Sequence, residues 1–162
     1  LKKLTEMIQV NITSVTELTH FYLAPMRAAK AGRIMNVAST AAFQPGPLMA
    51  VYYATKAYVL SFSEALSEET VGSGVTVTAL FPGPTLSGFQ DRANFNNILL
   101  MTATQVPTSH EVAIFGYQAM MKGQSVAIHG LLNKIGAASV RFTPRSLVVK
   151  MVRRLQEKRL NS

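Results

Sequence analysis

The sequence has 162 residues, of which 48% are hydrophobic and 15% charged, so it predicts a globular chain with a buried core. It contains no cysteine, which excludes disulfides and thiolate metal sites. The formal net charge is +8, but five of the basic residues lie in the last thirteen positions and the others are scattered. Without aromatic residues between these basic positions, the pattern argues against a nucleic-acid-binding protein.

The first half of the chain predicts two helices on either side of a short strand. Apolar residues recur at helical spacing over residues 3–24, up to Pro25. The apolar run at 34–38 follows a turn and indicates a buried strand. Residues 39–49 contain a Pro-Gly-Pro sequence and are expected to form a loop, and helical spacing returns over 50–71.

The second half continues the alternation of strands and helices. Residues 75–81 are β-branched and apolar, which predicts a second buried strand that ends at a Pro-Gly-Pro sequence. A helix is expected to open at Ser109 and end at Gly123, followed by a strand at 125–128 and two helices broken at Thr143-Pro144. Strands that alternate with helices indicate an α/β fold around a parallel sheet.

Candidate site residues follow the first two predicted strands of this sheet. Ser39 comes directly after the first strand, and Pro82 comes directly after the second. Tyr52 and Lys56 open the helix between them, so the start of that helix lies at the same edge. Ligands of parallel sheets bind beyond the carboxyl ends of the strands, and this edge is therefore the predicted site.

Tyr52 and Lys56 are four residues apart, so both side chains point to one face of the helix. A phenol has a pKa of about 10, which a neighbouring cation lowers, and Tyr52 then becomes a general acid or base. Taken alone, such a pair is more often an ordinary helix face. Tyr53 has alanine four residues later and is expected to be a packing residue.

Four segments together resemble the short-chain dehydrogenase/reductase family. They are Asn11 with its neighbours, the sequence Asn-Val-Ala-Ser that ends at Ser39, the sequence Tyr-Tyr-Ala-Thr-Lys from Tyr52 to Lys56, and the turn from Phe81 to Ser87. The intervals of 28 residues from Asn11 to Ser39 and thirteen from Ser39 to Tyr52 are similar to the family's spacing. The resemblance covers residues 1–130, and residues 131–162 are expected to form a helical, basic C-terminal extension.

The resemblance implies the C-terminal portion of a Rossmann-like, doubly wound parallel sheet and a role for each matching residue. Tyr52 would be the acid/base toward a carbonyl or secondary alcohol, Lys56 would lower its pKa and bind the nicotinamide ribose, and Ser39 would polarise the substrate oxygen. Asn11 would kink its helix and hold a water that relays protons from Lys56. The implied cofactor is NAD or NADP, and the residues expected to border it, besides Tyr52 and Lys56, are Pro82, Gly83, Thr85 and Ser87.

The Gly-rich turn that holds the dinucleotide phosphates in this family is not found in the sequence. Because the chain also opens at Leu1 in the middle of a helical pattern, we expect it to be part of a longer protein. Residues 1–162 alone are then expected to bind the dinucleotide weakly and to be inactive. The alternative is a non-catalytic or truncated homologue that acts through association.

The remaining expectations concern partners and location. An apolar substrate is suggested by hydrophobic residues in the irregular stretch 86–108, which would cover the pocket: Phe89, Phe95, Ile98 and Leu99. The family resemblance implies a homodimer or homotetramer. The three histidines share no ligand spacing, so no metal site is expected. We expect a cytoplasmic protein, with weak contact between the basic tail and anionic membrane as a further hypothesis.

Overall fold

A three-stranded parallel sheet forms the centre of the computed structural model, which describes residues 1–86 and 106–160. The strands are β1 (Gly32–Val37), β2 (Val75–Phe81) and β3 (Val126–Ile128), in the order β1-β2-β3. Gly32 pairs with Val75 and Val37 with Leu80, so β1 and β2 end at the same edge. The predicted α/β fold with a parallel sheet is confirmed.

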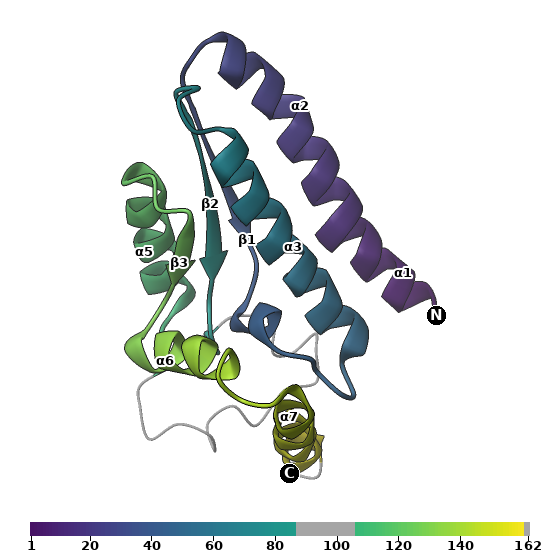
Figure 1. Ribbon diagram of the computed structural model, residues 1–162. Helices are drawn as coiled ribbons and strands as arrows, with labels where there is room; N and C mark the ends of the chain where they lie inside the picture. Colours follow the sequence, from purple (N-terminus) through teal and green to yellow (C-terminus); the bar gives the residue numbers. More distant parts are fainter. Residues whose placement is uncertain (87–105, 161–162) are drawn as a thin grey trace.

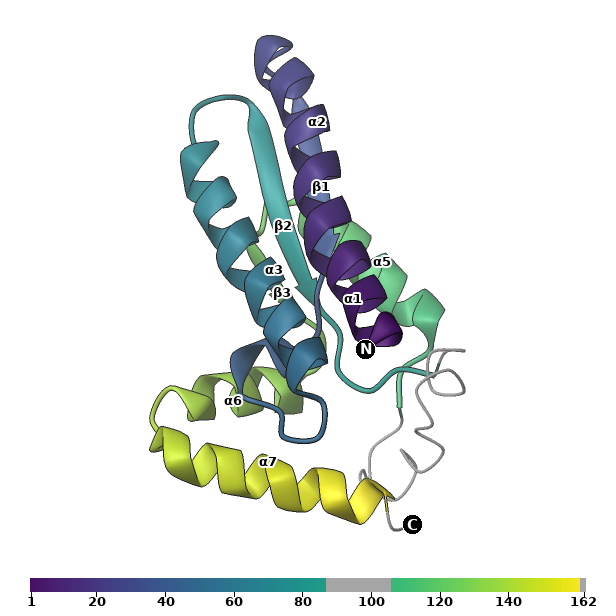
Figure 2. The same ribbon diagram turned by 90° about the vertical axis from the view of Figure 1, so that its right-hand side faces the viewer.

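Helices cover both faces of the sheet (Figure 1). An unbroken helical segment made of α1 (Lys2–Ile8), η1 (Gln9–Thr13) and α2 (Ser14–Ala28) lies with α3 (Ala50–Glu69) on one face, and α5 (Ser109–Met121) lies on the other. Beyond the carboxyl ends of the strands lie α6 (Leu131–Val140) and α7 (Arg145–Leu160), as Figure 2 shows from the side. Within the described residues, no helix has the length and apolarity required to cross a bilayer.

The predicted element bounds are correct for β2 and differ by a few residues elsewhere. The first helix, expected to end near Pro25, continues to Ala28, because a proline loses only its own hydrogen bond and the Ala29 N–H still donates to the Pro25 carbonyl at 3.0 Å. The expected loop 39–49 contains a short 3-10 helix, η2 (Thr40–Phe43). The α5 helix opens at Ser109 as predicted, and it is capped by Thr108, whose hydroxyl accepts from the Glu111 N–H.

The core lies between β2 and α3. Phe81, Val77 and Val59 are each fully buried there. A buried polar group crosses the same layer: the Asn36 amide donates to the Ser63 hydroxyl at 3.0 Å and accepts from the Thr19 hydroxyl at 3.4 Å. Because a buried polar atom is costly when unpaired, these bonds fix α2, β1 and α3 in one register.

The turn that leads into β2 requires glycine at one position. Gly72 and Gly74 both have φ of +78°, a conformation that favours glycine. A Cβ on Gly74 would lie 1.9 Å from the Lys30 carbonyl oxygen, whereas a Cβ on Gly72 would meet no atom within 4 Å. The absence of a side chain at Gly74 therefore allows the starts of β1 and β2 to lie close together.

We expect Gly74→Ala to lower the free energy of unfolding by about 3 kcal/mol, because it combines a left-handed backbone with a collision against backbone atoms. The matched variant Gly72→Ala keeps the backbone cost alone and is expected to lose about 1 kcal/mol. Urea denaturation of both variants measures the difference. Equal losses would contradict this account of the turn.

Candidate active site

A cavity of about 820 Å³ lies at the carboxyl edge of the sheet. Its lining includes residues from the ends of β1 and β2, from the first turns of α3, from α1 and from α7. Seven of the predicted site residues line it together: Asn11, Ser39, Tyr52, Lys56, Pro82, Gly83 and Thr85. The eighth, Ser87, lies outside the described residues, as do the apolar residues expected to cover the pocket.

Ser39 is held at the cavity by the continuation of the β1–β2 ladder past the strands. The Ala38 N–H donates to the Leu80 carbonyl at 2.8 Å, and the Thr40 N–H donates to the Pro82 carbonyl at 2.9 Å. The backbone of Ser39 between them is extended, and its hydroxyl accepts from the Ala41 N–H at 3.2 Å. These bonds on both sides leave Ser39 little freedom to move.

The side chain of Tyr52 is hydrogen-bonded to Ser39 inside the cavity. Burial raises the pKa of Tyr52 because the charged phenolate loses its solvation, and the neighbouring Tyr53 raises it further. The Ser39 hydrogen bond lowers this pKa, but by less than burial raises it. Tyr52 therefore keeps its proton at neutral pH, as an unperturbed phenol also does.

Lys56 lies beside Tyr52 but does not produce the expected fall in its pKa. The Lys56 Nζ is 5.8 Å from the centre of the Tyr52 ring and donates to the Val37 carbonyl at 3.4 Å. Burial also lowers the pKa of Lys56, because the ammonium loses solvation. Desolvation dominates the balance at Tyr52, and the expectation that Lys56 lowers the Tyr52 pKa stays a prediction for the protein with its cofactor bound.

Asn11 lies in the π-helical segment between α1 and α2. Such a segment contains one extra residue in a helical turn and is frequent at functional sites. The Asn11 amide donates to the Thr55 hydroxyl at 3.0 Å, and Thr55 donates to the Tyr52 carbonyl at 2.8 Å. Thr55 is fully buried, so this chain of bonds fixes the first helix against the turn that carries Tyr52. Thr55 was not among the predicted site residues.

The turn after β2 forms the opposite wall of the cavity. Gly83 packs against α6, where an added Cβ would lie 2.4 Å from the Asn133 amide nitrogen. The Thr85 hydroxyl donates to the Gly83 carbonyl at 3.0 Å. One residue later, the Leu86 N–H donates to the Pro107 carbonyl at 2.9 Å, which ties the turn to the start of α5. The backbone of this wall is therefore positioned from several sides.

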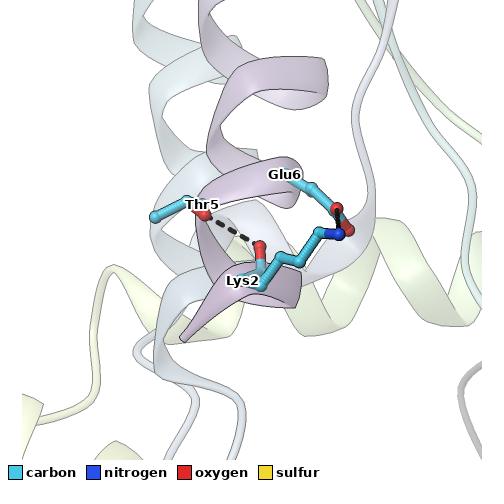
Figure 3. Close-up of polar contacts among 3 residues, drawn as sticks. All are labelled: Lys2, Thr5 and Glu6. Carbon is cyan, nitrogen blue, oxygen red and sulfur yellow. Dashed lines mark hydrogen bonds and ion pairs between the residues drawn. The ribbon is translucent and has the colours of Figure 1, made fainter.

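The first helix supplies a mixed polar and apolar wall through Lys3, Glu6, Met7, Val10 and Asn11. Figure 3 shows its first turn, where the Thr5 hydroxyl donates to the Lys2 carbonyl at 2.8 Å and Lys2 and Glu6 are 4.0 Å apart. Both charged side chains are more than half exposed, so the pair adds at most a few tenths of a kcal/mol. This ion pair lies within α1, whereas the Asn11–Thr55 and Thr16–Tyr58 hydrogen bonds join the helical segment to α3.

Tyr53 is confirmed as a packing residue, and it also has a polar partner that the sequence analysis missed. It is 9% exposed and packs with Ala41, Val148 and Val152. Its phenol oxygen accepts a hydrogen bond from Gln156 Nε2 at 2.8 Å. Helical spacing in the sequence could indicate that α7 has a buried face, but not what it packs against.

The chain belongs to the short chain dehydrogenase family, whose family model matches residues 1–97. It is 39% identical over 80 residues to an uncharacterized oxidoreductase, YvrD of Bacillus subtilis, covering 49% of this chain and 30% of the relative. It is 42% identical over 76 residues to 17-beta-hydroxysteroid dehydrogenase type 3 of Mus musculus, covering 47% and 25%.

Among solved structures, a short-chain dehydrogenase from Sphingobium yanoikuyae in complex with NADPH is similar, with a TM-score of 0.68 and 27% identity. That likeness covers 83% of this chain and 52% of the other. The chain matches only about a quarter to a third of the length of the two curated relatives, and half of the solved structure. The expected family and Rossmann-like fold are confirmed.

We expect Ser39→Ala to raise the pKa of Tyr52 further, because it removes the hydrogen bond that favours the phenolate and leaves the burial unchanged. NMR titration of the protein with ¹³C-labelled tyrosine measures this shift, and a Tyr52→Phe variant assigns the signal. A lower or unchanged Tyr52 pKa in Ser39→Ala would contradict the assignment of this bond.

Proposed function

We propose that the full-length gene product is an NAD(P)-dependent oxidoreductase that acts on a carbonyl or secondary alcohol, with Tyr52 as its acid/base. The observation that carries the proposal is the hydrogen bond between Tyr52 and Ser39 in a cavity at the carboxyl edge of the sheet. A buried phenol that keeps its proton at neutral pH suits proton donation to a carbonyl oxygen. The same group would take up a proton from an alcohol in the reverse reaction.

The cavity walls suit the nicotinamide end of a dinucleotide. Gly83 lines the cavity, while the side chain it lacks would point at Asn133 of α6, and its neighbours Pro82 and Thr85 line the same wall. Lys56, a cationic donor, would bind the ribose, and the expected contact of Ser87 belongs to the same proposal. The bound cofactor would supply the hydride. A similar structure holds NADPH, and the choice between NAD and NADP stays open in the proposal.

Ser39 and Tyr52 would share the substrate oxygen in this proposal. The two side chains already contact each other, so an oxygen placed between them meets both hydroxyls. Ser39 would donate to the oxygen and stabilise its developing negative charge, while Tyr52 transfers the proton. Lys56 would then stabilise the phenolate left on Tyr52, which requires that the ammonium approach closer than it does here.

Asn11 is proposed as a positioning residue that also serves proton relay. Its amide nitrogen is committed to Thr55, which leaves its amide oxygen as an acceptor for water. Because both Asn11 and Lys56 line the cavity, a water between them would connect Lys56 to solvent. This relay would return a proton to Tyr52 after each turnover.

We expect Tyr52→Phe in the full-length gene product to lower turnover of a ketone at least about a hundredfold, because it removes the proton donor. NADPH binding, measured by fluorescence titration, should change less than about threefold, since phenylalanine keeps the ring that borders the cofactor and loses only its hydroxyl. Tyr53→Phe is the matched control and should keep turnover within about tenfold of the wild type, because Tyr53 packs and donates no proton to substrate.

Wild-type turnover by Tyr52→Phe would remove Tyr52 from this role. Absence of turnover in the wild type, with every nicotinamide dinucleotide, would favour the non-catalytic homologue. In the same assay, residues 1–162 alone are expected to show no turnover, because they contain no Gly-rich phosphate-binding turn.

A second candidate function is weak attachment to an anionic membrane surface through α7. The helix presents exposed apolar residues four apart, Leu147, Met151 and Leu155, which are 49%, 58% and 43% exposed. Basic residues flank them on the same helix: Lys150, Arg153, Arg154 and Lys158. A helix that is apolar on one side and basic beside it suits the boundary of an anionic bilayer.

We expect the protein to cosediment with phosphatidylserine vesicles at low salt and to be released as salt rises, because the charges are screened. The double variant Met151→Gln with Leu155→Gln removes apolar contact with the bilayer and should weaken this binding. Cosedimentation unchanged by these substitutions and by salt would exclude α7 as the contact.

A further inference from the structure

Gln156 occupies an apolar position on the buried face of α7. The buried residues of this helix, Val148, Val152 and Gln156, are four apart and form one stripe. Gln156 is only 3% exposed, and glutamine is rarely buried so deeply. The stripe packs on Tyr53, whose ring is also covered by the loop at Gly46. A buried side-chain amide normally has hydrogen-bond partners for both its nitrogen and its oxygen.

Gln156 lines the cavity, and one half of its amide has a partner in the protein. Nε2 donates to the Tyr53 phenol oxygen at 2.8 Å, while Oε1 accepts no hydrogen bond from any described residue. Within the described residues, the only fully buried side-chain nitrogen or oxygen atoms without a hydrogen-bond partner are the hydroxyl oxygens of Thr76 and Thr78. Oε1 is therefore not sealed in protein, and the cavity is the space that Gln156 lines.

We propose that Gln156 forms a substrate subsite in which Oε1 accepts a hydrogen bond from a hydroxyl or N–H group remote from the reacting carbonyl. This inference rests on the proposed function, which places the carbonyl oxygen at Tyr52 and Ser39. The rings of Tyr52 and Tyr53 are 6.0 Å apart, and Gln156 bonds the second of them, so the subsite lies beyond the reacting end. A ketone with a hydrogen-bond donor at its far end can occupy both the reacting site at Tyr52 and the subsite at Gln156.

The same geometry predicts selectivity. The Tyr53 bond holds the Gln156 amide in one orientation, so its acceptor is fixed before a ligand arrives. A fixed acceptor in a desolvated wall favours a ligand that supplies a hydrogen-bond donor. A ligand without a donor would displace water from the acceptor and offer no hydrogen bond in return, so it is disfavoured. A ligand whose far end is an ether, which only accepts, should gain nothing from it.

The test uses the full-length gene product with NADP bound and three ketones of one shape: acetophenone, para-hydroxyacetophenone and para-methoxyacetophenone. Equilibrium dialysis of each ketone measures binding without turnover. For the wild type we expect the hydroxy ketone to bind about tenfold tighter than the other two, the effect of one added hydrogen bond. Gln156→Met keeps the side-chain shape and should reduce this ratio to near one.

Two further variants separate the subsite from a structural role. Gln44, another glutamine on the cavity wall to which no role is assigned, gives the matched control Gln44→Met, which should keep the preference for the hydroxy ketone. If Gln156→Met is poorly folded by circular dichroism, the double variant Gln156→Met with Tyr53→Phe removes both partners of this bond together. It should show the same loss of preference.

A ratio that is unchanged in Gln156→Met, or a wild type without preference for the hydroxy ketone, would overturn the subsite. An equal loss of affinity for all three ketones would assign Gln156 a structural role and would overturn it as well. Because binding is the readout, the result does not depend on turnover. A protein that binds the hydroxy ketone selectively but reduces no ketone would sink the proposed function and keep the subsite.

Discussion

The parallel pairing of β1 with β2 is the constraint on which the site depends. The register brings both strands to an end at one edge, and two backbone bonds continue the ladder past Ala38 and into Pro82. Ser39 lies between these bonds and the β2 turn lies opposite. A slip of one residue would turn the Ser39 side chain to the other face of the sheet and separate it from Tyr52.

Hydrogen bonds between elements then fix the helix that carries Tyr52 against that edge. Thr55 joins it to the π-helical segment through Asn11, and Tyr53 joins it to α7 through Gln156. This packing also desolvates the site, which raises the pKa of Tyr52 and lowers the pKa of Lys56. Burial, and not a neighbouring cation, therefore sets the direction in which the Tyr52 pKa shifts in this chain.

The sequence was sufficient to predict what local patterns determine. Residues 75–81 form β2 because a β-branched run lies between a Gly-containing turn and Pro82, and topology alone brought Ser39 and Tyr52 to one edge. The Tyr53–Gln156 bond joins residues 103 positions apart, which no spacing reveals. The Tyr52 pKa was missed for a related reason, because the extent of burial depends on the packing of distant segments.

The central claim is that Ser39 and Tyr52 hold one substrate oxygen between them. A crystal structure of the full-length gene product with NADP and a secondary alcohol tests it most directly. The account predicts that the alcohol oxygen lies about 2.6–3.2 Å from both the Ser39 Oγ and the Tyr52 Oη. An alcohol oxygen bound in the cavity beyond hydrogen-bond distance of either side chain would contradict it.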